Sequence, residues 1–267
     1  NMLNKLDLDL ITNVVNWNEF RDIQLSFFKA SVANLEAPTD HAIFATLYQK
    51  AKQYGIKYIM SGSNIVTEAV FVPESYGYNF WDSKQIKGIH KRFGKVKMKS
   101  FPIIGFWKRQ YYMRILGIKI IDLLNYLPYD KAKAISILKE KFDWREYSGK
   151  HHESIITRFH QSYILIKKFG VDKRKAHLSS LIYSGQMKRE EALKELEQDV
   201  CSPDMVQEDR GYVIKKWRIS EEEFESIMEE PPKSYKVYPN QERLMKLYKL
   251  ILYNVVVPIK RNIFKVS

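Results

Sequence analysis

The 267-residue chain is poor in the residues that build disulfide-rich, collagenous or disordered proteins. It contains a single cysteine, Cys201, with 11 glycines and 9 prolines. One cysteine cannot form an internal disulfide, a CxxC redox pair or a zinc knuckle, so we expect a reducing, cytoplasmic environment. Hydrophobic residues make up 45% and charged residues 28% of the chain. This composition is typical of a folded domain with a buried core.

Long uninterrupted hydrophobic runs are also missing. The most apolar stretch, residues 244–259, is broken by two lysines and a proline, and it is shorter than the roughly 20 residues of a membrane-spanning helix. Aspartates interrupt residues 6–10, so we expect no signal peptide. Acidic residues are outnumbered by basic ones, 31 to 44, which gives a net charge of +13. This charge favours an anionic partner such as a nucleotide, a phosphosugar or a nucleic acid.

Hydrophobic patterns in the first part of the chain predict a parallel α/β sheet. Residues 8–15 and 56–60 are β-branched runs typical of buried strands, and residues 20–33 and 40–54 between them have helical spacing. Ligands of such sheets bind at the carboxyl ends of the strands. The apolar residues expected on the buried face of the second helix are Ile43, Leu47 and Ala51.

From about residue 105 the patterns become helical. We therefore predict a partial nucleotide-binding α/β domain over residues 1–100 and a mainly helical substrate-recognition domain over residues 101–267, with the boundary near the basic residues 95–101. The predicted helices of the second part are 129–142, 153–169, 188–198, 221–228, which Ser220 caps, and 240–253, which Asn240 caps.

Small polar residues follow the second predicted strand, in the sequence SGSNIVTE at 61–68. Gly62 permits close approach to the backbone, the hydroxyl groups can bind an anion, and Glu68 can bind Mg²⁺ or a ribose hydroxyl. An ordinary strand-to-helix turn uses the same residue types, so the spacing leaves both interpretations open. No Gly-Lys-Ser/Thr follows, which excludes a Walker A loop.

A second polar cluster spans residues 144–161 and 172–180 and contains four of the six histidines. On a helix that starts at His151, the side chains of Ser154, Arg158 and Gln161 share its face. A solvated basic face is the alternative interpretation. A zinc site is not favoured, because the spacing is not HExxH and the excess of basic residues repels a cation.

Several motifs extend over nearly the whole chain. They are NWNEFRD at 16–22, DHAIFA at 40–45, SGSN at 61–64 with Thr67 and Glu68, LNYLPY at 124–129, GKHHES at 149–154, KFGVDKR at 168–174, AHLSSLI at 176–182, SGQM at 184–187 and REEAL at 189–193. With these motifs the chain resembles the N-acetyl sugar amidotransferases of surface-polysaccharide (lipopolysaccharide O-antigen) biosynthesis, which belong to the PP-loop ATP pyrophosphatase superfamily.

The resemblance implies an ATP-dependent reaction. ATP with Mg²⁺ activates the acetamido group of a nucleotide-linked N-acetylated sugar as an adenylate, and ammonia displaces AMP to leave an acetamidino group. The ammonia is expected from a separate glutaminase partner, because Cys201 lacks the setting of a glutaminase nucleophile. The positive charge of the chain suits both phosphorylated substrates.

The matched motifs also imply roles for individual residues. The nucleotide-binding residues are Ser61, Gly62, Asn64, Thr67 and Glu68, of which Glu68 is also the Mg²⁺ ligand. The substrate-binding residues are Lys150, Ser154, Arg158, Gln161, Asp172, Lys173 and Arg174. The catalytic residues are His151, Glu153 and His177, and the general base is one of the two histidines because imidazole titrates near neutral pH.

One departure from the family is clear. The Ser-Gly-Gly-x-Asp-Ser loop, whose backbone binds the pyrophosphate of ATP, is absent. The PP-loop core is therefore predicted to be truncated at its N-terminus, either because the chain is part of a longer product or because it is a shortened relative. The alternatives are a tRNA-modifying PP-loop protein and a non-catalytic scaffold subunit, although nucleic acid is not the favoured partner. Sheet edges left open by a missing strand would invite a second copy of the chain.

Overall fold

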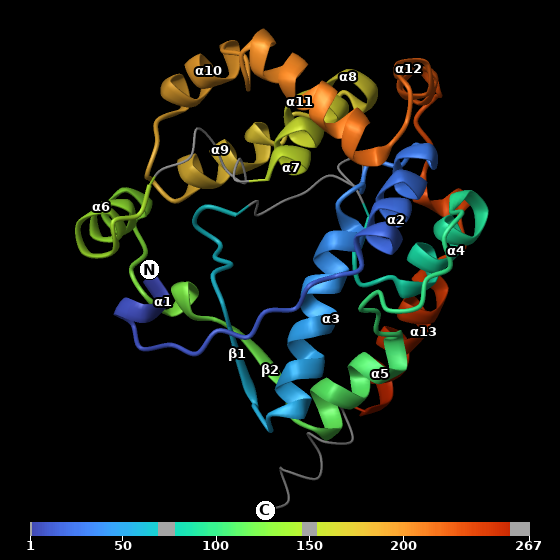
Figure 1. Ribbon diagram of the computed structural model, residues 1–267. Helices are drawn as coiled ribbons and strands as arrows, with labels where there is room; N and C mark the ends of the chain where they lie inside the picture. The colour runs from blue at the N-terminus through green and yellow to red at the C-terminus, as the bar shows by residue number, and fades with distance from the viewer. Residues whose placement is uncertain (1, 69–77, 146–153, 257–267) are drawn as a thin grey trace, which may run out of the picture.

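The computed structural model describes residues 2–68, 78–145 and 154–256, without the side chains of residues 255 and 256. Most of these residues are helical, and the one small sheet lies beside α3 (Figure 1). The α-helices are α1 (Met2–Lys5), α2 (Trp17–Lys29), α3 (Ala37–Gln53), α4 (Ser83–Phe93), α5 (Phe106–Gln110), α6 (Lys131–Phe142), α7 (Ile155–Phe159), α8 (Leu165–Phe169), α9 (Arg174–Tyr183), α10 (Arg189–Glu197), α11 (Pro203–Trp217), α12 (Glu221–Glu229) and α13 (Glu242–Ile251). Short 3-10 helices are η3 (Leu123–Tyr126) and η5 (Tyr235–Val237), and π-helical turns are η2 (Tyr111–Ile115), η4 (His160–Ile164) and η6 (Leu252–Val256).

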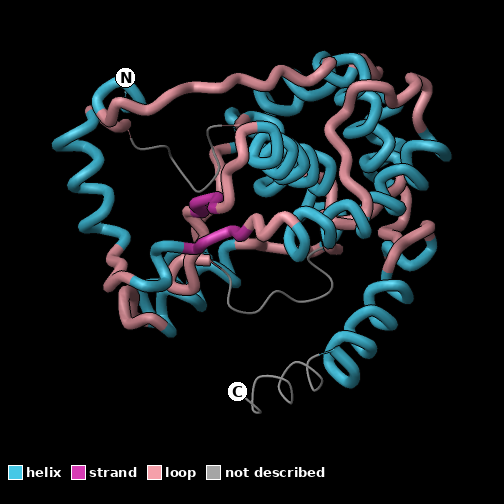
Figure 2. The backbone as a smooth tube through the Cα atoms, turned by 90° about the horizontal axis from the view of Figure 1, so that it is seen from below, coloured by secondary structure: helices cyan, strands magenta, loops and turns pink. Residues whose placement is uncertain are grey.

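The sheet consists of two parallel strands, β1 (Tyr58–Ser61) and β2 (Lys119–Asp122), with Ser61 opposite Asp122. Figure 2 shows them as a small pair among helices and loops. The expected parallel sheet is thus confirmed, but within the described residues it has only two strands. The predicted strand at residues 8–15 is wrong, because this segment is irregular and Val14 is 86% exposed. No strand in the described ranges pairs with it, so its backbone lacks the hydrogen-bond ladder that a strand needs.

Helix α3 packs with a different face from the one predicted. Its buried side chains include His41, Ala45 and Tyr48, whereas Ile43 is 52% and Leu47 38% exposed. The expectation of a buried Ile43 and Leu47 is therefore wrong, while Ala51 is buried as expected. The small alanines allow close packing on the buried side of α3. The rings of His41 and Tyr48 also lie on this side, and a pattern of aliphatic residues does not indicate them.

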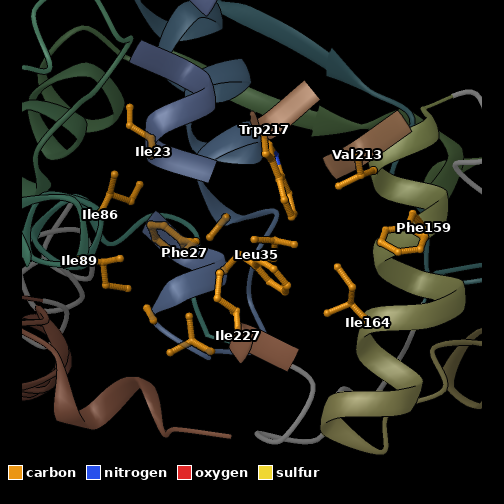
Figure 3. Close-up of a cluster of buried hydrophobic side chains, with 14 of the residues drawn as sticks. Ile23, Phe27, Leu35, Ile86, Ile89, Phe159, Ile164, Val213, Trp217 and Ile227 are labelled. Atoms are coloured by element: carbon orange, nitrogen blue, oxygen red, sulfur yellow. The ribbon is translucent and has the colours of Figure 1, made fainter. Parts of the chain in front are cut away.

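The larger hydrophobic cluster combines side chains from residues 23–101 with side chains from residues 159–238 (Figure 3). Phe27 of α2 and Ile86 of α4 belong to it together with Trp217 of α11, and Phe159 of α7 is fully buried in it. A smaller cluster packs Tyr48 of α3 against the sheet. Since residues from both sides of position 100 share the larger cluster, the division into two domains stays a prediction.

The helices expected after residue 105 are confirmed to within a few residues. The segment predicted as 153–169 is described from residue 154 and runs through α7, η4 and α8 without a break, with a π-helical turn in the middle. Ser220 caps α12 by accepting a hydrogen bond from the Glu223 amide at 3.1 Å. Gln241 takes the cap position of α13 that was expected for Asn240. No helix among the described residues is long and apolar enough to cross a membrane.

Candidate functional site

The loop that follows β1 is an ordered turn built around Asn64. The buried Asn64 side chain accepts hydrogen bonds from the backbone of Val66 and Thr67, at 3.1 and 2.8 Å, and from the Thr67 hydroxyl at 3.1 Å. The Ser63 amide donates to Ser61 Oγ at 3.0 Å, and the Glu68 amide donates to the Asn64 carbonyl. Because these backbone amides are already hydrogen-bonded within the loop, a ligand would bind mainly to the hydroxyl and carboxylate side chains of the loop.

Residues 61–68 are anchored on both sides. The Ile65 amide donates to the side chain of Asn125 in η3 at 2.9 Å, which ties the loop to the segment that follows β2. On the other side Ser180 of α9 donates to the Glu68 carbonyl, and Ser184 donates to the Val66 carbonyl at 3.4 Å. The structure therefore places the loop 61–68 against α9, which contains part of the polar cluster 172–180.

Four polar residues line one side of α9 and of the two residues that cap it. Lys173, His177, Ser180 and Ser184 are spaced by four, three and four positions, which places them along one side of the helix. Ser180 and Ser184 hold the loop, and Lys173 lies about 10.5 Å from Ser180 along the axis, at 1.5 Å per residue. His177 consequently lies between the loop and the group that Lys173 contacts.

That group is Glu36, at the start of α3. Its Oε2 lies 3.5 Å from Lys173 Nζ, 3.2 Å from Gln161 Nε2 and 3.3 Å from Nδ1 of the buried His160. Burial opposes the charged form of Glu36, but the contacts with His160, Lys173 and Thr157 outweigh it and hold its pKa well below its usual range. Glu36 is therefore a carboxylate at neutral pH, placed between the first and second halves of the chain.

Asp40 lies one helical turn after Glu36 on α3. It is open to solvent on one side, and the surrounding protein and the neighbouring charge of Glu36 together raise its pKa to about 6, against the attraction of Lys173. A carboxyl group with this pKa can exchange a proton near neutral pH. Strongly shifted carboxyl groups are more frequent in functional sites than elsewhere. Asp40 belongs to the motif DHAIFA at 40–45, whereas Glu36 lies in none of the motifs.

Two of the predicted substrate ligands have structural partners. Arg158 donates to both carboxylate oxygens of the buried Asp209, at 2.8 and 2.7 Å. Arg174 binds Asp172 and donates to the carbonyls of Glu195 and Gln198. Both guanidinium groups therefore connect separate helices of the fold. Their roles as substrate ligands stay predictions.

The remaining predicted residues fall into two groups. Ser154 caps α7 by accepting a hydrogen bond from the Thr157 amide at 3.3 Å. The predicted residues Lys150, His151 and Glu153 lie outside the described residues. A role for His151 as general base thus stays a prediction, as does a role for His177.

The fit to Mg²⁺ and ATP rests on few side chains. Among residues 2–68, 78–145 and 154–256 no three His, Cys, Asp or Glu side chains cluster as a metal site would require. Mg²⁺ that arrives with a nucleotide needs only one or two protein carboxylates, since phosphates and waters complete its shell. Glu68 could supply such a carboxylate from the loop.

Comparison with known proteins identifies part of the chain. Residues 153–252 match the family described as "LPS biosynthesis protein WbpG-like, C-terminal domain". The match covers the segment from α7 to α13, including the whole of α9. No curated protein matches the chain.

Proposed function

Because residues 153–252 match the WbpG-like C-terminal domain of lipopolysaccharide (LPS) biosynthesis proteins, we propose that the chain takes part in an ATP-dependent amidotransfer to an N-acetylated sugar. The α-phosphorus of ATP bonds to the acetamido carbonyl oxygen and pyrophosphate leaves. Ammonia then adds to the carbonyl carbon, the carbon–oxygen bond breaks, and AMP departs with that oxygen. Loss of a proton leaves the acetamidino group.

The single observation that carries the proposal is the polar face of α9. It connects the loop 61–68, through Ser180, with Glu36 and Asp40, through Lys173. A nucleotide at the loop and an acetamido group beside His177 would then lie within the length of one short helix. This arrangement suits a reaction that joins two substrates, because both are held by the same rigid element.

The charges of this face suit the product. An acetamidino group is a planar cation with paired N–H donors, so it resembles a guanidinium group and matches a carboxylate. Glu36 is ionised, and Asp40 can accept a proton as ammonia adds. Lys173 lies beside Glu36, where its charge can stabilise the negative charge that develops on the bridging oxygen as the carbon–oxygen bond breaks and AMP departs.

The test measures amidine formation by the full chain. A UDP-linked diacetamido sugar is incubated with Mg²⁺-ATP and ammonium chloride, which replaces the proposed glutaminase partner, and the products are followed by mass spectrometry. Lys173→Met is the test variant, and Lys175→Met, on an exposed position of the same helix, is the matched control. We expect product from the wild type and from Lys175→Met, and at least about tenfold less from Lys173→Met because one charge-assisted contact is lost.

Two results would contradict the proposal. One is equal product from both variants, which would remove Lys173 from the site. The other is the absence of any product together with tight, salt-dependent binding of tRNA, which would favour an RNA-modifying protein instead.

A further inference from the structure

The positive charge of the chain is concentrated in two segments of its sequence. Of the 44 basic residues, 14 lie in residues 83–121 and 243–254, which contain no aspartate or glutamate. The other 30 basic residues are balanced by the 31 acidic residues of the chain. The two segments therefore account for the whole excess of positive charge. Charge that is concentrated in this way gives a local positive potential, which attracts an anionic partner.

The fold brings these two segments together. Tyr248 of α13 packs edge-on against Phe106 of α5, with ring centroids 5.0 Å apart, and its hydroxyl donates to Gln110 at 2.8 Å. The Gln241 amide, just before α13, donates to the buried Asp82 at 2.6 Å, just before α4. Helices α5 and α13 lie on the side of the molecule away from α9 and α10 (Figure 1).

The outward face of α13 carries three apolar side chains, which we call the apolar stripe: Leu247, Leu250 and Ile251. Their spacing of three and four positions places them on one side of the helix, and they are 47–59% exposed. Met245 and Tyr248 point the other way and contact the rest of the fold. Neither hydrophobic cluster of the described residues includes the stripe. An exposed apolar row with a polar rim is typical of an interaction surface.

Aromatic and basic side chains border the apolar stripe. Trp107 of α5 is 64% exposed, and its ring centroid lies 6.2 Å from that of Tyr248. Arg114 Cζ lies 5.5 Å from the centroid of the same tyrosine. Arg243 and Lys249 of α13 are exposed. Tryptophan beside basic residues is typical of membrane interfaces, because the ring lies at the level of the headgroups and the cations attract anionic lipids.

Acidic side chains do not offset these cations. Asp82 is buried, and Glu242 at the start of α13 is occupied by Lys246, whose Nζ lies 2.6 Å from its carboxylate. A nucleic acid would also be attracted by the positive potential, but the apolar stripe offers it no hydrogen bonds. A bilayer with anionic lipids matches both features, since its headgroups attract the cations and its acyl chains accept the leucine and isoleucine side chains.

We propose that α13 and α5 dock the protein on an anionic membrane surface, with α13 parallel to the bilayer and the apolar stripe at the boundary between headgroups and acyl chains. This docking goes beyond the proposed amidotransfer, because it uses neither the loop 61–68 nor α9. An interfacial helix lies in the plane of the bilayer. The docking therefore needs no spanning helix, and the described residues contain none.

The first test is co-sedimentation of the full chain with vesicles of equal parts phosphatidylglycerol and phosphatidylcholine, and with vesicles of phosphatidylcholine alone. Arg243→Gln combined with Lys249→Gln removes two cations. Arg189→Gln combined with Lys194→Gln, at exposed positions of α10, is the matched control. We expect binding to the anionic vesicles only. It should be at least about tenfold weaker in the test variant and unchanged in the control, because each cation near an anionic surface contributes about fivefold.

A second variant tests the apolar stripe, which a purely electrostatic contact would not use. Leu250→Gln keeps the charge and a good helix former, and Leu193→Gln, at an exposed position of α10, is its matched control. We expect Leu250→Gln to weaken binding to anionic vesicles by about tenfold, because one leucine side chain is no longer buried in the bilayer. The control should bind as the wild type does. Circular dichroism verifies that each variant is folded.

Trp107 reports the contact directly. Transfer of its exposed ring from water to the headgroup layer predicts a blue shift of tryptophan fluorescence when anionic vesicles are added. We expect this shift to disappear in Trp107→Phe, which keeps an aromatic ring at the same position. A blue shift of the same size in Trp107→Phe would overturn the assignment of this surface.

Other results would also overturn the inference. They are the absence of binding to anionic vesicles, and equal vesicle binding by the charge variant and its control. Salt-dependent binding of duplex RNA that Leu250→Gln leaves unchanged, without vesicle binding, would assign the surface to a nucleic acid instead. Self-association that Leu250→Gln abolishes, again without vesicle binding, would assign the apolar stripe to a second copy of the chain.

Discussion

The contact between Arg158 and Asp209 gives a prediction that separates a structural role from substrate binding. Both Nε and Nη2 of Arg158 donate to the Asp209 carboxylate, at 2.8 and 2.7 Å, and these side chains are only 18% and 4% exposed. Arg158→Met would leave the Asp209 carboxylate buried without a counter-charge. Loss of one partner of a buried pair costs about 3–5 kcal/mol, a large part of the roughly 5–15 kcal/mol that stabilises a domain.

The assay is urea unfolding at pH 7, followed by circular dichroism. Arg189→Met, at an exposed position of α10, is the control and is expected to change the free energy of unfolding by no more than about 0.5 kcal/mol. Asp209→Leu alone should also destabilise the fold, and the double variant should be more stable than the sum of the single losses predicts, because it leaves no unpaired buried charge.

A loss below about 1 kcal/mol in Arg158→Met, combined with loss of sugar-nucleotide binding, would refute this reasoning. It would show that Arg158 exchanges Asp209 for a substrate, as the matched motif first suggested. A large loss of stability with normal affinity in the folded fraction would confirm the structural role.

Three further predictions concern the carboxylates and the loop. Burial raises the pKa of Glu19, but hydrogen bonds from the backbone of residues 99–101 outweigh burial and lower this pKa overall. The Glu19 carboxylate therefore stabilises the fold above about pH 4.3, and this stabilisation is lost as the pH falls through the lowered pKa. Glu19→Gln should therefore cost about 1.5–3 kcal/mol in urea unfolding at pH 7 and flatten the acid limb, whereas Glu229→Gln, on an exposed position, should do neither. Asp40 behaves oppositely: its pKa of about 6 lies above the unfolded value of about 3.9, so stability falls as the pH rises between them. Asp40→Asn should abolish this fall, and an unchanged pH profile of unfolding would contradict the assignment. Asn64→Ala should cost about 1 kcal/mol by removing the cap of the turn, and it should raise amide hydrogen exchange in residues 65–68, where unchanged exchange would count against the turn as described.

Helices α6, α10, α12 and α13 could be predicted because local signals define them, whereas α9 and α11 were not predicted. Ser220 and Ser154 cap the helices that follow, and hydrophobic spacing gives their lengths. The strand predicted at residues 8–15 failed because a strand depends on a neighbour that local sequence does not reveal. Its β-branched residues satisfy the propensity of a strand but have no partner in the described ranges.

The candidate site could be predicted only in part for the same reason. Motifs indicated the loop 61–68 and Lys173 separately, but nothing in the spacing showed that α9 joins them. Local sequence does not single out Glu36, because its partners lie far along the chain, with Gln161 at a separation of 125 and Lys173 at 137. The pairing of Arg158 with Asp209, 51 positions away, was equally invisible in the sequence.

The most direct test of the proposed amidotransfer follows the acetamido oxygen itself. The sugar nucleotide is prepared with isotopically heavy oxygen in its acetamido carbonyl and incubated with the full chain, Mg²⁺-ATP and ammonium chloride. Adenylation of that oxygen predicts AMP that carries the label, in an amount equal to the amidine formed. Amidine accompanied by unlabelled AMP, or labelled sugar that remains unchanged while the protein binds both substrates, would contradict the account.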